Sequence, residues 1–186
     1  MKPCILIGHC PLDKGAYHKS IGSEYDYNLE IAFGLRSEID IFTIKDFKKG
    51  YTNTIKQDVY PMTKDYDLVL ELHFNAVNNS SVNGCEALYW HKSPIGKKIA
   101  EKFCKLMNEE FGSTNRGAKP ISNASQRGYA TFAYQKPTVV LLEPFFCTGT
   151  ETEKFDDPQE KERYRNVIRK LLDWVEDEKL FNTVSP

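Results

Sequence analysis

The stretch DLVLELHFNA, residues 67–76, predicts a buried strand that ends in polar side chains. An apolar run at 68–70 comes first, and His73 and Asn75 follow where the strand should end. Burying an imidazole or an amide without a hydrogen-bond partner costs about 1–3 kcal/mol. Both groups therefore need polar partners, and the rest of the sequence should supply them.

The composition indicates one globular domain. The chain has 186 residues, of which 40% are hydrophobic and 12% aromatic, enough for a real core. It carries 25 Lys and Arg against 26 Asp and Glu, a net charge of -1. This balance argues against a general preference for nucleic acid or for an anionic membrane surface.

The N-terminal sequence contains only a short apolar run, at residues 5–7. Such a run is too short for the core of a signal peptide and far too short to span a bilayer. We therefore expect synthesis in the cytoplasm without a signal peptide, and no stable membrane insertion. The oligomeric state is left open.

The cysteines do not form a recognisable framework. Their number is odd and no pair has the CxxC spacing, which argues against disulfides and against a thiolate zinc site. We expect them to be small buried hydrophobic residues, at positions Cys4, Cys10, Cys85, Cys104 and Cys147.

Short apolar runs alternate with amphipathic segments along the chain. The predicted strands lie at 3–8, 39–44, 68–75, 85–91, 118–122 and 138–146. The predicted helices lie at 24–37 after a Ser23 cap, around 52–64, from Pro94 to Gly112, and at 159–179. This alternation predicts an α/β fold with a mixed, mostly parallel central sheet of about six strands and helices on both faces.

In such sheets, functional groups gather where parallel strands end. The first strand ends at His9 and the third at His73, while Glu143 lies inside the apolar strand 138–146. Glu24 begins the first helix, directly after the loop that leaves His9. Two imidazoles and two carboxylates can thus meet at one edge. Two histidines and one carboxylate are a catalytic zinc set, because they leave a fourth position open for water.

Each of these residues also has a simpler interpretation. His9 or His73 alone is commonly a hydrogen-bonded structural histidine. Glu24 alone fits the favourable place of an acidic residue at a helix N-terminus. Glu143 is different, because a carboxylate within TVVLLEPFF needs a metal, a cation or a proton to offset its desolvation.

The order of short motifs resembles the zinc-dependent N-acetylmuramoyl-L-alanine amidases of the Amidase_3 type. The resemblance covers residues 5 to about 146. The motifs are GH at 8–9, E-x-x-x-N at 24–28, ELHFNA at 71–76, G-x-E at 84–86, RG at 116–117 and LLEPFF at 141–146.

This resemblance implies that residues 1–186 form a single zinc amidase catalytic domain. It implies one Zn²⁺ held by His9, Glu24 and His73, with Glu143 as the catalytic carboxylate. Zinc supplies the acidity that makes a water molecule reactive near neutral pH. Glu143 would take a proton from that water and deliver it to the departing amine.

One stretch departs from the family pattern. Members commonly have glycines after the first histidine, as in GHGG, whereas this chain has Gly8-His9-Cys10-Pro11. Cys10 is a weak candidate ligand, because the side chains of adjacent residues diverge. A site in which His18 replaces Glu24 would contain three histidines, and this alternative stays open.

The resemblance favours peptidoglycan as substrate, at the amide bond between the lactyl group of N-acetylmuramic acid and L-alanine. Asn75 lies on the same face of its strand as His73 and is a candidate for substrate binding. Arg116 and Arg127 are candidates for binding stem-peptide carboxylates, because a guanidinium binds a carboxylate through two hydrogen bonds.

Two alternatives use the same features. A zinc carboxypeptidase or N-acyl amino acid amidohydrolase would share the metal and base but act on a small soluble substrate. A catalytically silent peptidoglycan-binding module would keep the fold alone, and the presence of Glu143 argues against it. An enzyme without an export signal that acts on the bacterial cell wall is best explained as a bacteriolytic endolysin, or as a domain of a larger wall hydrolase.

Overall fold

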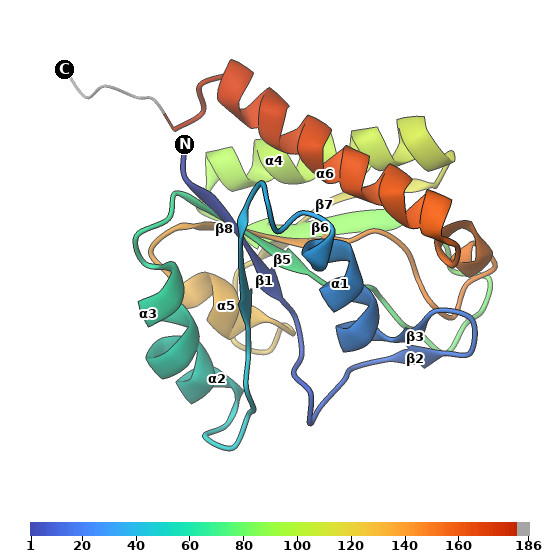
Figure 1. Cartoon of the computed structure of the whole chain (residues 1–186). Coiled ribbons are helices and arrows are strands. Elements are labelled where there is room, and N and C mark those ends of the chain that lie inside the picture. The colour runs from blue at the N-terminus through green and yellow to red at the C-terminus, as the bar shows by residue number, and fades with distance from the viewer. Residues whose placement is uncertain (182–186) are drawn as a thin grey trace.

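The computed structural model describes residues 1–181, which contain a six-stranded sheet with helices on both faces (Figure 1). The strand order is β4-β1-β5-β8-β6-β7. The strands are β1 (Pro3–Ile7), β4 (Asp40–Thr43), β5 (Leu68–Leu72), β6 (Cys85–Trp90), β7 (Asn115–Ile121) and β8 (Thr138–Glu143). All six correspond to predicted strands.

The sheet is mixed and mostly parallel, as predicted. β1 is parallel to β4 and β5, and β5 is parallel to β8. β6 runs antiparallel to β8, and β7 is parallel to β6. The beginnings of β6 and β7 therefore lie at the same edge of the sheet as the ends of β1, β5 and β8.

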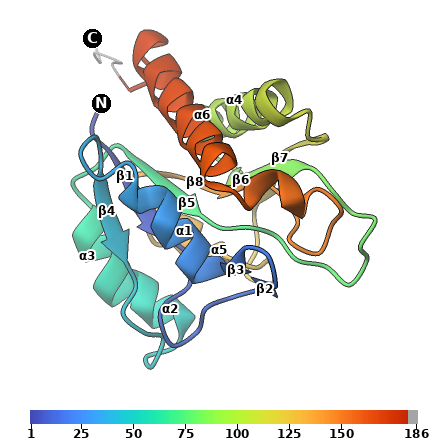
Figure 2. The same cartoon turned by 45° about the vertical axis from the view of Figure 1, so that its right-hand side comes forward.

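Helices cover the sheet in two layers, and Figure 2 shows the same arrangement from another side. One face is covered by α1 (Glu24–Phe33), α4 (Pro94–Phe111) and α6 (Pro158–Asp177). The other face is covered by α2 (Tyr51–Thr54), the π-helix η1 (Ile55–Val59), α3 (Tyr60–Thr63) and α5 (Tyr129–Ala133). The predicted cover on both faces is confirmed.

The long helices begin at residues whose side chains cap them. The hydroxyl of Ser23 accepts a hydrogen bond from the Asp26 amide, which confirms the predicted cap of α1. Ser93 and Asp157 cap α4 and α6 in the same way, each followed by proline. A cap at residue 23 fixes Glu24 as the first residue of α1.

The first helix ends earlier than predicted, at Phe33 rather than residue 37. Arg165 of α6 donates hydrogen bonds to the carbonyl oxygens of Glu30 and Ile31, near the end of α1. A Cβ on Gly34 would lie 2.2 Å from the Arg165 side chain. The helix therefore ends where α6 packs against it.

Several short elements were not predicted. They are the hairpin of β2 (Tyr17–His18) and β3 (Gly22–Ser23), the helix α5, and the 3-10 helix η2 (Thr152–Phe155). Elements of two to five residues are too short to show a periodic pattern. The third and last predicted strands also end earlier, at Leu72 and Glu143, although a bridge between Asn75 and Phe146 continues their pairing.

The two faces of β5 point into two separate hydrophobic layers. Leu68, Leu70 and Leu72 belong to the layer under α1, α4 and α6. Val69 belongs to the layer under η1 and α5. Because side chains alternate along a strand, Glu71 and His73 share the face of Val69. This alternation decides where the polar end of the strand points.

The five cysteines are all free and buried, as predicted. Among residues 1–181, none of the helices combines the length and the apolar character needed to cross a membrane.

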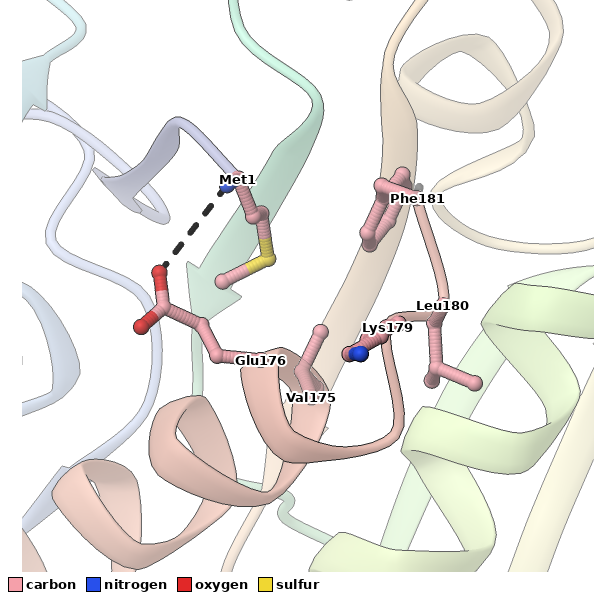
Figure 3. Close-up of a pocket in the computed structure, with 6 residues that line it drawn as sticks. All are labelled: Met1, Val175, Glu176, Lys179, Leu180 and Phe181. Atoms are coloured by element: carbon pink, nitrogen blue, oxygen red, sulfur yellow. Dashed lines mark ion pairs between the residues drawn. The ribbon is translucent and has the colours of Figure 1, made fainter. Parts of the chain in front are cut away.

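A small pocket lies between the N-terminus and the end of α6 (Figure 3). The α-amino group of Met1 is 3.9 Å from a carboxylate oxygen of Glu176 there. Because Met1 precedes β1, this pocket lies at the sheet edge opposite the strand ends. Its lining residues are Met1, Val175, Glu176, Lys179, Leu180 and Phe181.

Central packing makes a direct prediction about stability. Leu70 is 0% exposed in the middle of β5, so Leu70→Ala should lower the free energy of unfolding by about 2–5 kcal/mol. Leu12→Ala removes the same atoms from a side chain that is 74% exposed and should change it by less than about 0.5 kcal/mol. Urea unfolding measures both, and equal effects would contradict the described core.

Candidate metal centre

Three side chains from separate elements meet at the edge where β1 and β5 end. His9 follows β1 after Gly8, His73 follows β5 directly, and Glu24 is the first residue of α1. One ligand atom of each lies within 4.8 Å of those of the other two. The structure thus brings together the three residues for which the sequence predicted a metal site.

The Glu24 carboxylate lies between the two imidazoles. Its Oε1 is 2.8 Å from Nδ1 of His73, and its Oε2 is 3.2 Å from Nε2 of His9. The same two oxygens accept hydrogen bonds from the backbone N–H groups of Phe74 and Ala16, both at 3.1 Å. The carboxylate is therefore fixed from the strand end and from the loop that precedes α1.

Two glycines allow the chain to pass close to these side chains. A Cβ on Gly8 would lie 2.2 Å from His73 Nε2, so only glycine leaves room for that ring. Gly15, at φ +73°, lies where a Cβ would be 2.6 Å from both Glu24 Oε2 and His9 Nε2. The loop after β1 therefore closes tightly around the three residues.

His9 itself has a left-handed backbone, with φ at 65°. This conformation costs a residue other than glycine about 1–3 kcal/mol and is concentrated at functional sites. Here it occurs at the residue whose ring turns toward Glu24 and lies 5.1 Å from the ring of His73, centroid to centroid.

Hydrogen bonds between the carboxylates and the imidazoles strongly shift the pKa values of Glu24 and His73. Burial alone would raise the pKa of Glu24, but hydrogen bonds to His73 and His9 outweigh it and hold that pKa well below its usual range. Burial alone would lower the pKa of His73, but hydrogen bonds to Glu24 and Glu71 raise it well above its ordinary value. Glu24 is thus a stable anion, suited to a cation between the rings.

The donor set fits a zinc ion. Two imidazole nitrogens and one carboxylate oxygen are common ligands of catalytic zinc, and three protein ligands leave one position open. Within residues 1–181, these three residues form the group of histidine and acidic side chains gathered closely enough to hold a metal. His18 and Cys10 lie outside this group: His18 contacts Ser20, and the backbone of Cys10 pairs with Asp13.

Glu143 lies beside His73 at the end of β8. The parallel register pairs Leu72 with Leu142, so the next residue on each strand is also a neighbour on the same face. Its Oε2 is buried and, among the described residues, has no hydrogen-bond partner. Burial, together with Glu24 and other carboxylates, raises the pKa of Glu143 to about 8, although His73 opposes the shift. The carboxyl group thus lies next to His9, Glu24 and His73, which we call the triad, and its Oε2 is free to accept a proton.

Asn75 and Arg116 meet at Glu86, the residue of β6 that pairs with Glu143. The Asn75 amide donates to Oε1 of Glu86 at 2.9 Å, and Nε of Arg116 donates to Oε2 at 2.9 Å. The Arg116 guanidinium also lies 4.8 Å from the ring centre of Phe146. These groups form a polar row that extends from the triad across β8 and β6 to β7.

Arg127 is placed differently. It is exposed in the loop between β7 and α5, and within the described part of the chain it forms no ion pair. No described contact joins it to the triad or to the row of Asn75, Glu86 and Arg116.

Sequence reasoning missed two carboxylates of this region. Glu86 lay in the G-x-E motif without a role, and it proves to connect Asn75 with Arg116. Glu71 was included in the apolar strand, although it is 1% exposed and contacts His73 Nε2. The period of two between Glu71, His73 and Asn75 was the signal for a shared face.

Comparison with known proteins identifies the family of this chain. The family described as N-acetylmuramoyl-L-alanine amidase (Amidase_3) matches residues 4–173. A characterised relative is the germination-specific N-acetylmuramoyl-L-alanine amidase of Bacillus subtilis. It is 23% identical over 181 residues, covering 88% of this chain and 74% of the relative.

Solved structures with a similar fold include two from this comparison. The catalytic domain of the CD27L endolysin, which targets Clostridia difficile, is 27% identical with a TM-score of 0.70. The match covers 93% of this chain and 97% of that one. An N-acetylmuramoyl-L-alanine amidase from Clostridium difficile 630 shares the fold, with a TM-score of 0.74 at 20% identity over 96% of this chain and 98% of that one.

Removing His73 tests the metal centre. We expect His73→Ala to lose zinc, from about one ion per chain to near none, because two ligands hold it far more weakly than three. The exposed His91 gives a matched control, and His91→Ala should keep the metal, as should His18→Ala. Elemental analysis after dialysis measures the zinc content of each variant. Undiminished zinc in His73→Ala would remove His73 from the site, and loss in His18→Ala would restore the three-histidine alternative.

Proposed function

The chain belongs to the N-acetylmuramoyl-L-alanine amidase family, and from this premise we propose which of its residues act on peptidoglycan and how. His9, Glu24 and His73 hold one Zn²⁺, and Glu143 is the general base. The observation that supports this most directly is the meeting of the three donor atoms within 4.8 Å, next to Glu143, whose buried Oε2 has no hydrogen-bond partner among the described residues.

The reaction is hydrolysis of the amide bond between the lactyl group of N-acetylmuramic acid and L-alanine. When bound, Zn²⁺ supplies a Lewis acid that makes a water molecule more acidic and an amide carbonyl more electrophilic. Glu24 contributes the one negative charge of the ligand set, and the histidines bind as neutral imidazoles.

Glu143 moves the proton. Its carboxylate takes a proton from water as the water oxygen bonds to the carbonyl carbon, and it delivers that proton to the nitrogen as the C–N bond breaks. The products are a carboxylic acid on the lactyl group and a free amino group on L-alanine. Protonation matters because an amine leaves poorly as an anion. Burial and the neighbouring carboxylates raise the pKa of Glu143 to about 8, and a pKa near neutral suits a group that takes up a proton and returns it.

Substrate binding is assigned to Asn75, Arg116 and Arg127. Glu86 holds Asn75 and Arg116 in place, and the Arg116 side chain is still 36% exposed. Its remaining N–H groups are available to a stem-peptide carboxylate. Arg127, on an exposed loop, would contact a more distant part of the stem peptide.

The partner is peptidoglycan, and we propose neither nucleic acid nor a membrane as a second one, in line with the net charge of -1. We also propose that residues 1–186 form one catalytic domain, supported by the single six-stranded sheet of the described residues. Similarity to the CD27L endolysin domain supports an endolysin-like, bacteriolytic role at the cell wall.

The choice between amidase and the alternative hydrolases depends on the substrate. Incubation with purified peptidoglycan should release fragments with new L-alanine N-termini, detected by amino-terminal labelling. Activity confined to free N-acyl amino acids or to C-terminal residues would favour the alternatives, and binding without turnover would favour a silent module.

Glu143→Ala should reduce turnover of peptidoglycan by about 10²–10⁴-fold while zinc content stays at one per chain, because the base is lost and the ligands remain. The matched control is Glu109→Ala, on the exposed side of α4, which should leave turnover unchanged. Full activity of Glu143→Ala would reject the assignment of the base.

Arg116→Ala and Arg127→Ala should each raise KM by about tenfold with little change in kcat, because a charged hydrogen bond contributes about 1.5–3 kcal/mol to binding. Arg36→Ala removes an exposed arginine that follows α1 and should have no effect. If KM for soluble muropeptides were the same in all three variants, neither candidate arginine would bind the stem peptide.

A further inference from the structure

Glu71 is a buried carboxylate that the proposed reaction does not use. It is 1% exposed, and both of its oxygens have partners. Oε1 lies 3.1 Å from Nε2 of His73, and Oε2 accepts a hydrogen bond of 2.6 Å from the hydroxyl of Thr131. Burying a carboxylate is costly without such partners, so its place behind His73 needs a reason.

Hydrogen bonds continue from Glu71 into the helical layer beneath the sheet. The Gln135 amide donates to the hydroxyl oxygen and to the carbonyl oxygen of Thr131, both at 3.0 Å. Thr63, at the end of α3, donates to Oε1 of Gln135 at 2.7 Å. Thr63 and Thr131 are both 0% exposed. This buried chain therefore joins α3 and α5 to the end of β5.

Donors and acceptors in this series of hydrogen bonds can be assigned in only one way. A carboxylate only accepts, so Thr131 donates its hydroxyl proton to Glu71 and has a lone pair left for the Gln135 amide. By the same rule, His73 Nε2 donates its proton to Glu71 Oε1. Nδ1 faces Glu24 Oε1 at 2.8 Å, a second carboxylate oxygen that only accepts, so Nδ1 donates there. A cation bound at Nδ1 would take the place of that proton, while the Nε2 proton stays directed at Glu71.

We propose that Glu71 is a positioning residue for the metal ligand His73. The carboxylate holds the imidazole with Nε2 protonated and Nδ1 aimed at the cation, and Thr131, Gln135 and Thr63 hold the carboxylate. This inference rests on the proposed role of His73 as a zinc ligand. Carboxylates that accept from the second nitrogen of a ligating histidine fix the ring and increase its basicity.

The arrangement leaves the ring little freedom. Glu71 and His73 lie two residues apart on one face of β5, so their contact follows from the pleat of the strand. Directly after the neighbouring strand β1, Gly8 approaches the ring so closely that a Cβ would lie 2.2 Å from Nε2. Glu24 contacts the other nitrogen. The ring is therefore held on three sides.

A purely structural role for Glu71 makes a different prediction. If the hydrogen bonds that run from Glu71 to Thr63 only stabilise the packing of α3 and α5 on the sheet, their loss should lower the melting temperature without changing the zinc affinity. The two roles are separated by measuring both quantities in the same variants.

The experiment uses Glu71→Gln and Thr131→Val in the full chain. Glu71→Gln keeps the shape and can still accept from Nε2 but removes the charge, and Thr131→Val removes the hydroxyl that holds the carboxylate. The control for the first is Glu151→Gln, whose carboxylate accepts from the Gly84 amide and has no described contact with His73. Thr152→Val is the control for the second, because Thr152 is also buried and hydrogen-bonded.

The readouts are the zinc dissociation constant, by competition with a chromophoric chelator at fixed pH, and the visible spectrum of the Co²⁺-loaded protein. We expect Glu71→Gln to weaken zinc binding by about 10–100-fold and to alter the Co²⁺ spectrum. Thr131→Val should weaken binding in the same direction by less. Both controls should leave the zinc constant unchanged, whatever they do to the melting temperature of the metal-free protein.

Unchanged zinc affinity and an unchanged Co²⁺ spectrum in Glu71→Gln would overturn the proposal, even if that variant melted earlier. An equal loss in the control variants would also overturn it, because the effect would then be a general result of destabilisation. If the unaltered chain bound no zinc, the proposed metal centre itself would fail, and this outcome is distinct from the other two.

Discussion

The structure depends on one buried carboxylate, Glu24, held between the imidazoles of His9 and His73. A carboxylate that is only 3% exposed is tolerated because two rings and two backbone N–H groups surround it. These partners come from two separate segments: His73 and Phe74 follow β5, and His9 and Ala16 lie in the loop between β1 and α1. The ends of β1 and β5, the loop before α1 and the capped first turn of α1 must all be in place before the carboxylate is satisfied, so the site and the fold of this edge form together.

The mixed sheet then determines what lies around that carboxylate. Parallel pairing of β5 with β8 brings Glu143 beside His73, on the face that also contains Glu71. Antiparallel pairing of β6 with β8 places Glu86 opposite Glu143, and β7 adds Arg116 beyond it. A cation held by the triad would therefore lie next to Glu143, the proposed general base, with Glu71 contacting the ligand His73 and with Glu86 and Arg116 on the strands beyond Glu143. We propose that the N-acetylmuramoyl-L-alanine amidase activity of the family depends, in this chain, on this order of side chains across four strands.

Much of the fold and of the candidate site was predictable from the sequence. Long apolar strands and helices with clear caps have strong local signals, and the rule that polar groups gather at strand ends led from DLVLELHFNA to His9, Glu24, His73 and Glu143. The resemblance to a known family added the roles. What could not be predicted depends on contacts between distant segments. The end of α1 at Phe33 is set by Arg165 of α6, the pairing of Arg116 with Glu86 is set by strand order, and the role of Thr131 depends on α5, a helix of five residues without periodicity.

The most direct test of the central claim is anomalous X-ray diffraction at the zinc edge, on crystals of the full chain grown with zinc. We expect one strong peak within bonding distance of His9, Glu24 and Nδ1 of His73, with Glu143 close by but not coordinated. A peak bound by other residues, or an ordered His9, Glu24 and His73 without any peak between them, would contradict it.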